Sequence, residues 1–422
     1  MDLIIRNAKL RDKKELYDLG IENGKFTQIE TTIKDEGKQE IDAGGNLVIP
    51  PFIESHVHLD SALTVGNPRF NESGTLLDGI AIWGEYKEGI TKERIKATAK
   101  ETILWEMANG VLRIRTHADS TEPSLLTVQA LLELKEEMRD YVDIQVVAFP
   151  QDGILAHPQS AELLEKAVKM GADVIGGIPQ VEFTREDGIR SIEIVFELAQ
   201  KYEKLIDIHT DETSDDQSRF AEVIAKHAVL SGMEGMVTAS HTTAMHNYDN
   251  DYAAKLIGLL KRAEINIITN PASNALLQNR LDGYPRRRGH TRVDELLHAG
   301  VNVSIGNDNI MDPFGPLGKG SMLQSANLLI HTAHLSGSNL IPKVFDLITI
   351  NGAKTLNLTD YGIELGNQAD LVILDAKDEY EALRLLSEAI YVVRKGRVVV
   401  ETKVAEREIT LGSETVTVDF KR

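Results

Sequence analysis

Hydrophobic and polar positions follow two different rhythms along the chain. The first 45 residues contain short alternating runs separated by turns, such as LIIRNAKL from Leu3, a pattern typical of β-strands. From residue 48 to about 310, short β-branched runs alternate with helix-period stretches, such as SAELLEKAVKMG from Ser160. Strand-like runs return near the end of the chain. The pattern therefore predicts a small β unit, a long βα repeat and a second β segment.

The βα repeat contains eight strand candidates. After a first long loop, their starts lie roughly 30 residues apart, the length of one strand, one helix and two loops. Eight parallel strands with crossover helices close into a (β/α)₈ TIM barrel, and an open doubly wound sheet is the alternative. The candidates begin at residues 47, 111, 143, 172, 205, 236, 265 and 301.

The two ends of the chain share their strand-rich character. We assign the barrel to residues 48–358 and expect residues 1–47 and 359–422 to pair into one small β-sandwich beside it, because chain termini commonly lie close together. The predicted fold class is α/β.

Composition excludes several kinds of function. Acidic residues number 65 against 46 basic residues, a net charge of −19, and this field repels phosphate backbones and anionic lipid. We therefore expect neither nucleic acid nor membrane partners. No cysteine is present, so any metal ligands must be histidines or carboxylates. No signal-like or long apolar segment is visible, so we expect a cytoplasmic protein.

Candidate chemistry gathers where the barrel strands end, which is the face that carries active sites in this fold. Five of the twelve histidines lie at such positions. The polar residues at the strand ends are His56, His58, His117, Asp119, Gln151, His209, Asp211, Glu212, His241 and Asp308.

A subset of these residues suits a metal ion. His56 and His58 stand two apart on a strand, so both rings face one side; alone, such a pair is more typical of two half-buried histidines than of a metal site. His209 and Asp308 complete a three-histidine, one-carboxylate set that fits Zn²⁺ or Fe²⁺ with a position left for water. The fourth strand ends without a lysine, so we expect one divalent ion per subunit.

Glu212 follows His209 by three residues and could exchange protons with a substrate above the metal. With His241 and Asp308 it is expected to form a proton relay between water and a leaving group. The alternative is a surface carboxylate within the acidic run DETSDD.

The ordered motifs resemble the amidohydrolase superfamily and, within it, the bacterial cytosine deaminase family. The resemblance spans nearly the whole chain. The motifs are ESHVHLD, SGTLLDGI, RTHAD, VAFPQDGI, EFTREDGI, LIDIHTDE, DDQSRF, TASHTTAMH, YPRRRGHTRV and GNDN.

The resemblance implies a metal held by His56, His58, His209 and Asp308. It also implies that Glu212 moves a proton from water to a ring nitrogen, that His241 orients the water, that Asp308 passes a proton to departing ammonia and that Gln151 binds the amide edge of a pyrimidine. A homo-oligomer is expected on the same ground.

Two departures from the family pattern concern substrate recognition. Asn309 stands where the family has a second acidic residue, and Phe314 replaces a tryptophan. We count both among the substrate-binding residues. The expected reaction is hydrolysis of cytosine to uracil and ammonia. The alternatives are deamination of 5-methylcytosine, isoguanine or creatinine, or removal of an alkylamine from a triazine.

A non-catalytic protein on a decayed enzyme fold should have lost a ligand or the proton shuttle, and none is missing. Arg286, Arg287 and Arg288 favour a solvated loop or an oligomer contact, although the family uses this segment near the mouth of its active site.

Overall fold

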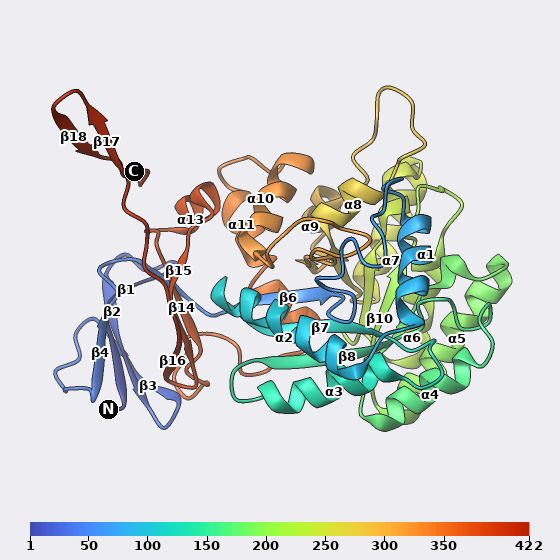
Figure 1. Cartoon of the computed structure of the whole chain (residues 1–422), viewed down its shortest axis with the longest axis horizontal. Helices are drawn as coiled ribbons and strands as arrows, with labels where there is room; N and C mark the ends of the chain where they lie inside the picture. Colours follow the sequence, from blue (N-terminus) through green and yellow to red (C-terminus); the bar gives the residue numbers. More distant parts are fainter. Residues whose placement is uncertain (422) are drawn as a thin grey trace.

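The protein, seen in a computed structural model that describes residues 1–421, contains two eight-stranded sheets and a separate two-stranded hairpin. Figure 1 shows the larger unit, a barrel surrounded by helices, beside a smaller sheet in which blue N-terminal and red C-terminal strands lie together. Each sheet has its own cluster of buried apolar side chains. Among the described residues, no helix is long and apolar enough to cross a membrane.

The barrel sheet runs in sequence order, and every neighbouring pair of strands is parallel. A parallel bridge between Val57 and Asp308 joins the first strand to the segment after the last one and closes the barrel. The predicted (β/α)₈ barrel is therefore confirmed, and the open sheet is excluded. Its strands are β6 (Phe52–Val57), β7 (Val111–Asp119), β8 (Asp143–Phe149), β9 (Val174–Gly177), β10 (Leu205–Thr210), β11 (Val237–His241), β12 (Asn266–Thr269) and β13 (Val303–Ile305).

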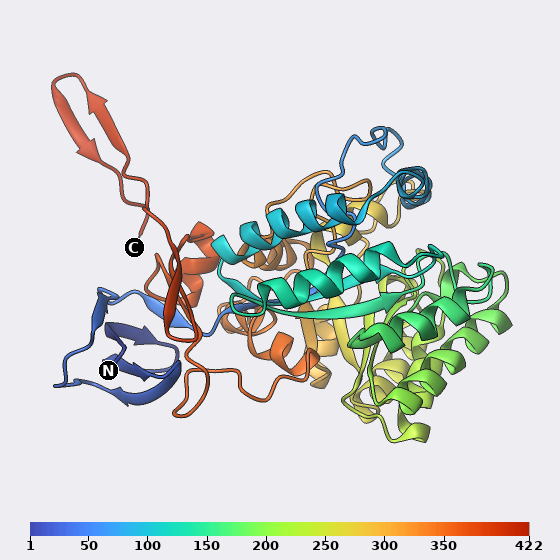
Figure 2. The ribbon, with the colours of Figure 1, turned by 60° about the horizontal axis from the view of Figure 1, so that its bottom comes forward.

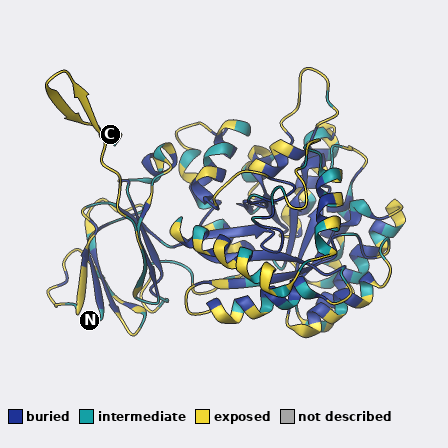
Figure 3. Cartoon of the chain, in the orientation of Figure 1, coloured by how far each residue is buried: buried dark blue, intermediate teal, exposed yellow. Residues whose placement is uncertain are grey.

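Helices cover the outside of the barrel, with exposed faces toward solvent and buried faces toward the strands (Figures 2 and 3). Helix α5 illustrates why: the Thr184 side chain accepts from the Asp187 N–H at its start, and Ile192, Val195 and Ala199 form its buried stripe at helical spacing. The helices are α1 (Leu76–Lys87), α2 (Lys92–Ala108), α3 (Leu126–Met138), α4 (Ser160–Met170), η1 (Pro179–Val181), α5 (Arg185–Tyr202), α6 (Phe220–Ser231), η2 (Thr243–Asn247), α7 (Asn250–Arg262), α8 (Pro271–Leu277), α9 (Val293–Ala299), α10 (Met322–Thr332), α11 (Ile341–Asp346), α12 (Ile350–Thr355) and α13 (Glu379–Leu385).

The second sheet draws strands from both ends of the chain, in the order β16-β15-β14-β5-β1-β2-β3, with β4 paired to β1. Antiparallel pairing of β5 with β14 joins the two ends, as the sequence predicts. Domain boundaries at 47 and 358 stay a prediction. The strands are β1 (Leu3–Leu10), β2 (Leu16–Glu22), β3 (Lys25–Glu30), β4 (Gln39–Asp42), β5 (Leu47–Ile49), β14 (Leu371–Leu374), β15 (Ala389–Arg394) and β16 (Arg397–Glu401).

Two details differ from the sequence-based expectations. The run that begins at residue 47 is two strands, because Pro50 and Pro51 lack the N–H groups that a continuous ladder needs; β5 joins the small sheet and β6 the barrel. The last predicted strands, β17 (Glu408–Leu411) and β18 (Glu414–Thr417), pair only with each other among the described residues. All eight of their residues are exposed, so the hairpin has no buried face to pack on the sheet, and it projects away in Figure 1.

Candidate active site

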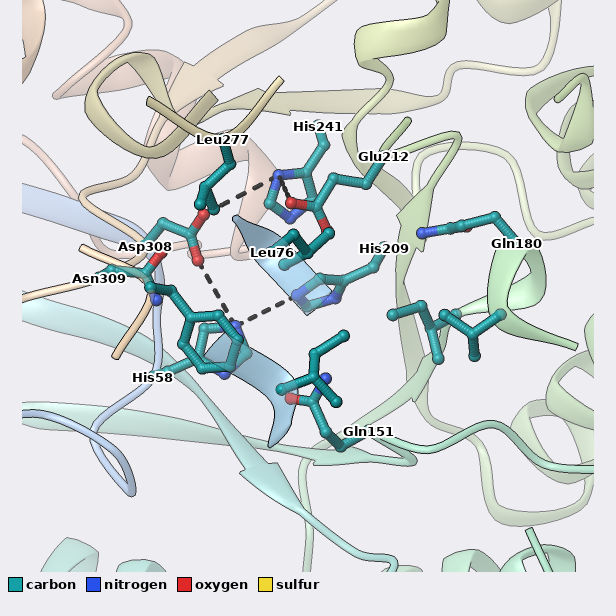
Figure 4. A pocket seen from close by; sticks show the side chains of 14 residues that line it. His58, Leu76, Gln151, Gln180, His209, Glu212, His241, Leu277, Asp308 and Asn309 are labelled. Carbon is teal, nitrogen blue, oxygen red and sulfur yellow. Dashed lines mark hydrogen bonds and ion pairs between the residues drawn. The ribbon is translucent and has the colours of Figure 1, made fainter. Parts of the chain in front are cut away.

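The predicted metal ligands converge at the carboxyl ends of the barrel strands, and Figure 4 shows His58, His209 and Asp308 close together. His56 lies in β6 with His58 just beyond it, and His209 lies in β10. Asp308 follows β13 and is fixed by the bridge that closes the barrel: its N–H donates to the His56 carbonyl at 2.7 Å, and its carbonyl accepts from the His58 N–H at 2.9 Å. Closure of the barrel thus brings the first and last ligand positions together.

The distances between the side-chain atoms suit one divalent cation. His58 Nε2 lies 3.2 Å from His209 Nε2, and Asp308 Oδ1 lies 3.5 Å from Nε2 of both His56 and His58. Nitrogen and oxygen ligands arranged tetrahedrally about 2.0–2.1 Å from Zn²⁺ are roughly 3.3 Å apart. His56 Nε2 is buried without a hydrogen-bond partner among the described residues, as expected of an atom that offers its lone pair to a metal ion.

Burial keeps these histidines neutral. It lowers the pKa of His56, His58 and His209 well below the ordinary value, and repulsion among the clustered rings lowers it further. Neutral imidazoles have the free lone pair that metal binding requires. The donor set therefore fits a divalent metal ion both in geometry and in protonation state.

Glu212 and His241 lie beside this cluster. His241 is the last residue of β11, and its Nδ1 is 3.7 Å from Glu212 Oε1 and 3.9 Å from Asp308 Oδ2. Burial raises the pKa of Glu212 to about 8, and burial, with help from His117, lowers the pKa of His241 to about 3. The site thus holds a carboxyl group that can carry a proton near neutral pH and an imidazole that stays neutral.

Two asparagines that the sequence analysis missed hold His241 in place. The side-chain amides of Asn274 and Asn270 approach His241 Nδ1 at 3.0 and 3.3 Å. Both follow β12, the seventh barrel strand, within the run TNPASN. The rule that polar residues at strand ends belong to the site would have found them, had it been applied to this strand as well.

A small pocket opens beside the cluster. Its lining combines polar side chains with apolar ones, among them Leu76 and Ile80 of α1. Gln180, which the sequence analysis did not select, also borders the pocket, and both polar atoms of its side chain lack a partner among the described residues. The lining residues are His58, Leu76, Ile80, Gln151, Ile178, Gln180, Val181, His209, Glu212, His241, Leu277, Asp308, Asn309 and Phe314.

The three predicted substrate-binding residues all border this pocket. Gln151 follows β8, and Phe314 packs with Trp83 and Leu277 in an apolar cluster. Asn309 is engaged by the protein at both ends of its amide: Nδ2 donates to Asp312 Oδ2 at 2.8 Å, and Oδ1 accepts from Ser273 Oγ at 2.8 Å. The Asn309 amide therefore braces the loop after β13.

The remaining candidates lie outside the pocket. His117 packs against the cluster, with its ring centroid 4.0 Å from that of His56. Asp119 accepts from Trp83 Nε1 at 3.0 Å and from Lys87 Nζ at 2.7 Å, which ties α1 to the barrel. Residues 286–288 are exposed, and Arg287 pairs with Asp282.

Comparison with known proteins agrees with this geometry. A crystal structure of 5-methylcytosine deaminase from Klebsiella pneumoniae liganded with 5-fluorocytosine is 44% identical, with a TM-score of 0.94 over 97% of this chain and 100% of that one. The N-isopropylammelide isopropylaminohydrolase of Burkholderia multivorans superposes with a TM-score of 0.82 at 25% identity, over 94% and 98% of the two chains.

Sequence relatives point the same way. The N-isopropylammelide isopropyl amidohydrolase of Pseudomonas sp. (strain ADP) is 32% identical over 414 residues, which cover 96% of this chain and 98% of the relative. Residues 39–400 match the amidohydrolase family. The barrel, the histidine and aspartate cluster and these matches together establish that the chain is a hydrolase acting on C–N bonds and belongs to the amidohydrolase family.

Proposed function

We propose that the protein is a metal-dependent hydrolytic deaminase of cytosine-type bases that converts 5-methylcytosine to thymine and ammonia. Cytosine, the substrate favoured by the sequence alone, is the expected second substrate. The observation that carries this proposal is the position of Glu212: a buried carboxyl with a pKa of about 8 stands 3.7 Å from His241, next to the metal-binding cluster and a small pocket.

The substrate preference follows from the pocket wall and the comparisons. Leu76, Ile80, Leu277 and Phe314 line the pocket with apolar surface, and a 5-methyl group gains free energy when it leaves water for such a surface, by roughly 0.8 kcal/mol. The similar structure described as a 5-methylcytosine deaminase supports this choice. Gln151 is the residue we assign to the amide edge of the base, and its side chain can both donate and accept.

His56, His58, His209 and Asp308 would hold one Zn²⁺ or Fe²⁺ ion. Bound there, the ion would supply Lewis-acid activation of water. Glu212 accepts a proton from the attacking water and delivers it to the ring nitrogen, while neutral His241 orients the water. Asp308 takes the second proton of the same water and passes it to the departing amino group, so one water and one base yield the oxo base and ammonia. A pKa near the working pH suits Glu212 to both proton steps.

A second candidate function is removal of an alkylamine from a triazine. It is favoured by the 32% identical relative and by the second similar structure, both described as acting on N-isopropylammelide. The same cluster and the same Glu212 would serve, and the two functions differ in the released product, an alkylamine in place of ammonia.

One experiment separates the candidates. Purified protein of measured metal content is incubated with 5-methylcytosine, cytosine, isoguanine, creatinine and N-isopropylammelide, and ammonia and isopropylamine are quantified. We expect ammonia release fastest from 5-methylcytosine and next from cytosine. Isopropylamine release as the fastest reaction would establish the second candidate, and metal-loaded protein inactive on all five compounds would overturn both.

A further inference from the structure

A chain of buried polar groups runs from His56 to the floor of the barrel. The Nδ1 atom of His56 lies 3.1 Å from the hydroxyl of Ser240, and that hydroxyl lies 2.6 Å from Oδ1 of Asp207. All three side chains are completely buried. None of the proposed catalytic steps uses Ser240 or Asp207.

The donors and acceptors along this chain determine which ring nitrogen of His56 carries the proton. Asp207 is paired with Arg115, whose Nη1 donates to Oδ2 at 3.1 Å, so the carboxylate can only accept. The single hydroxyl proton of Ser240 is therefore donated to Asp207, and Ser240 is left to accept from the ring of His56. That requires the proton of His56 on Nδ1, which leaves the lone pair on Nε2, the atom that faces Asp308.

The charged end of the chain is itself held rigidly. Arg115 also donates to the Thr238 hydroxyl at 3.2 Å, to the Thr355 carbonyl at 3.0 Å and to Oε1 of Gln145 at 3.0 Å. These contacts connect β7, β8 and β11 with α12, so Asp207 is fixed from several sides of the barrel.

Asp207 also belongs to a second group of possible metal ligands, with His56 and His117. Both of its oxygens already accept, one from Arg115 and one from Ser240. This group is therefore better explained as the support of the site than as a second metal site.

We infer that Ser240 and Asp207 are positioning residues that hold His56 in the Nδ1–H tautomer and aim its Nε2 lone pair at the metal ion. The inference rests on the metal-binding part of the proposed function and is independent of the substrate. Partners of this kind, which bind the far nitrogen of a ligating histidine, typically contribute 10–100-fold to metal affinity.

The first test measures metal affinity of Ser240→Ala by competition with a chromophoric Zn²⁺ chelator. Ser304→Ala is the matched control, since Ser304 is also a completely buried barrel serine, but its hydroxyl contacts Thr355 at 3.0 Å and no predicted ligand. We expect roughly 10–100-fold weaker binding for Ser240→Ala and less than a twofold change for Ser304→Ala. Equal affinities in the two variants would overturn the inference, whichever substrate the enzyme uses.

The second test reads the tautomer of His56 directly in the wild-type protein. Histidines of the metal-free wild-type protein are labelled with ¹⁵N, and His56 is assigned by the loss of its signals in His56→Gln. The ring shifts should place the proton of His56 on Nδ1, and in Asp207→Asn the Nε2–H tautomer should gain population. A wild-type ring protonated on Nε2 would refute the inference even if Asp207→Asn failed to fold.

Discussion

Glu212 shows how one buried side chain acquires its chemistry from its surroundings. Its carboxyl follows β10 and is only 8% exposed, and burial alone raises its pKa to about 8. If Glu212 were instead a surface carboxylate within the acidic run DETSDD, the same group would be ionised at neutral pH. Position in the fold, and not residue type, makes it a candidate proton shuttle.

We expect Glu212→Gln to lower kcat for deamination by roughly 10²–10⁴-fold, the usual contribution of a general acid–base group. Metal content should stay at the wild-type value, because Glu212 is not among the four predicted ligands. Ammonia release and metal analysis on the same preparation check both statements. Full activity in this variant would refute the assigned role.

His290 predicts a pH dependence of stability away from the cluster. It is 2% exposed, and burial, aided by the charges of His246 and Arg288, lowers its pKa to about 4. As the pH falls, His290 takes up a proton at about pH 6.5 in the unfolded chain but only near pH 4 in the folded chain. The contribution of neutral, buried His290 to stability is therefore complete above about pH 6.5 and is lost as the pH falls toward 4. The loss is about 3 kcal/mol.

The free energy of unfolding of His290→Leu should therefore fall less steeply than that of the wild type between pH 6.5 and 4. Denaturant unfolding at several pH values measures this difference. His298→Gln, at an exposed histidine, is the control and should keep the wild-type slope. A His290→Leu slope equal to that of the control would contradict the prediction.

At the scale of elements, α1 forms a wall of the pocket through a very close contact. A Cβ atom on Gly79 would lie 2.6 Å from Cδ1 of Phe314, whereas one on Gly84, in the same helix, would meet nothing within 4 Å. Gly79 therefore lets α1 and the Phe314 ring approach each other, and the pocket depends on that approach.

We expect Gly79→Ala to displace Phe314 or α1 and to lower kcat/KM for 5-methylcytosine by roughly 10-fold or more. Gly84→Ala should leave kcat/KM unchanged and add up to about 1 kcal/mol of stability, because alanine favours the helix. Steady-state kinetics and thermal unfolding of both variants test the contrast. Equal kinetics would show that α1 does not shape the pocket.

Helices and strands could be predicted from the sequence where the pattern that specifies them lies within their own residues. Barrel strands and their order could be predicted because each has its own apolar run and its own crossover helix. The division between β5 and β6 was missed although Pro50 and Pro51 mark it, since both halves are apolar. That β17 and β18 stay apart from the small sheet depends on contacts that no local pattern encodes.

At the scale of the whole molecule, the predicted ligands connect distant parts of the barrel. They come from β6, from β10 and from the segment after β13, so a metal ion would cross-link the first, fifth and eighth strands. We expect chelation to destabilise the fold by about 2.7 kcal/mol relative to a solution with free metal at 100 times its Kd. Thermal unfolding with and without chelator measures this, and an unchanged midpoint would argue against a metal in this cluster.

The sequence by itself determined the barrel and its strand ends, because periodicity is a local property. Strand-end position, which is local too, predicted the candidate site residues, which are His56, His58, His209, Glu212, His241 and Asp308. Only the tertiary structure decided what surrounds them. The close packing of α1 on Phe314, the asparagines beside His241 and the buried chain from Arg115 to His56 join residues far apart in the sequence. Their geometry and protonation follow from closure of the barrel and exclusion of water, which no single segment specifies.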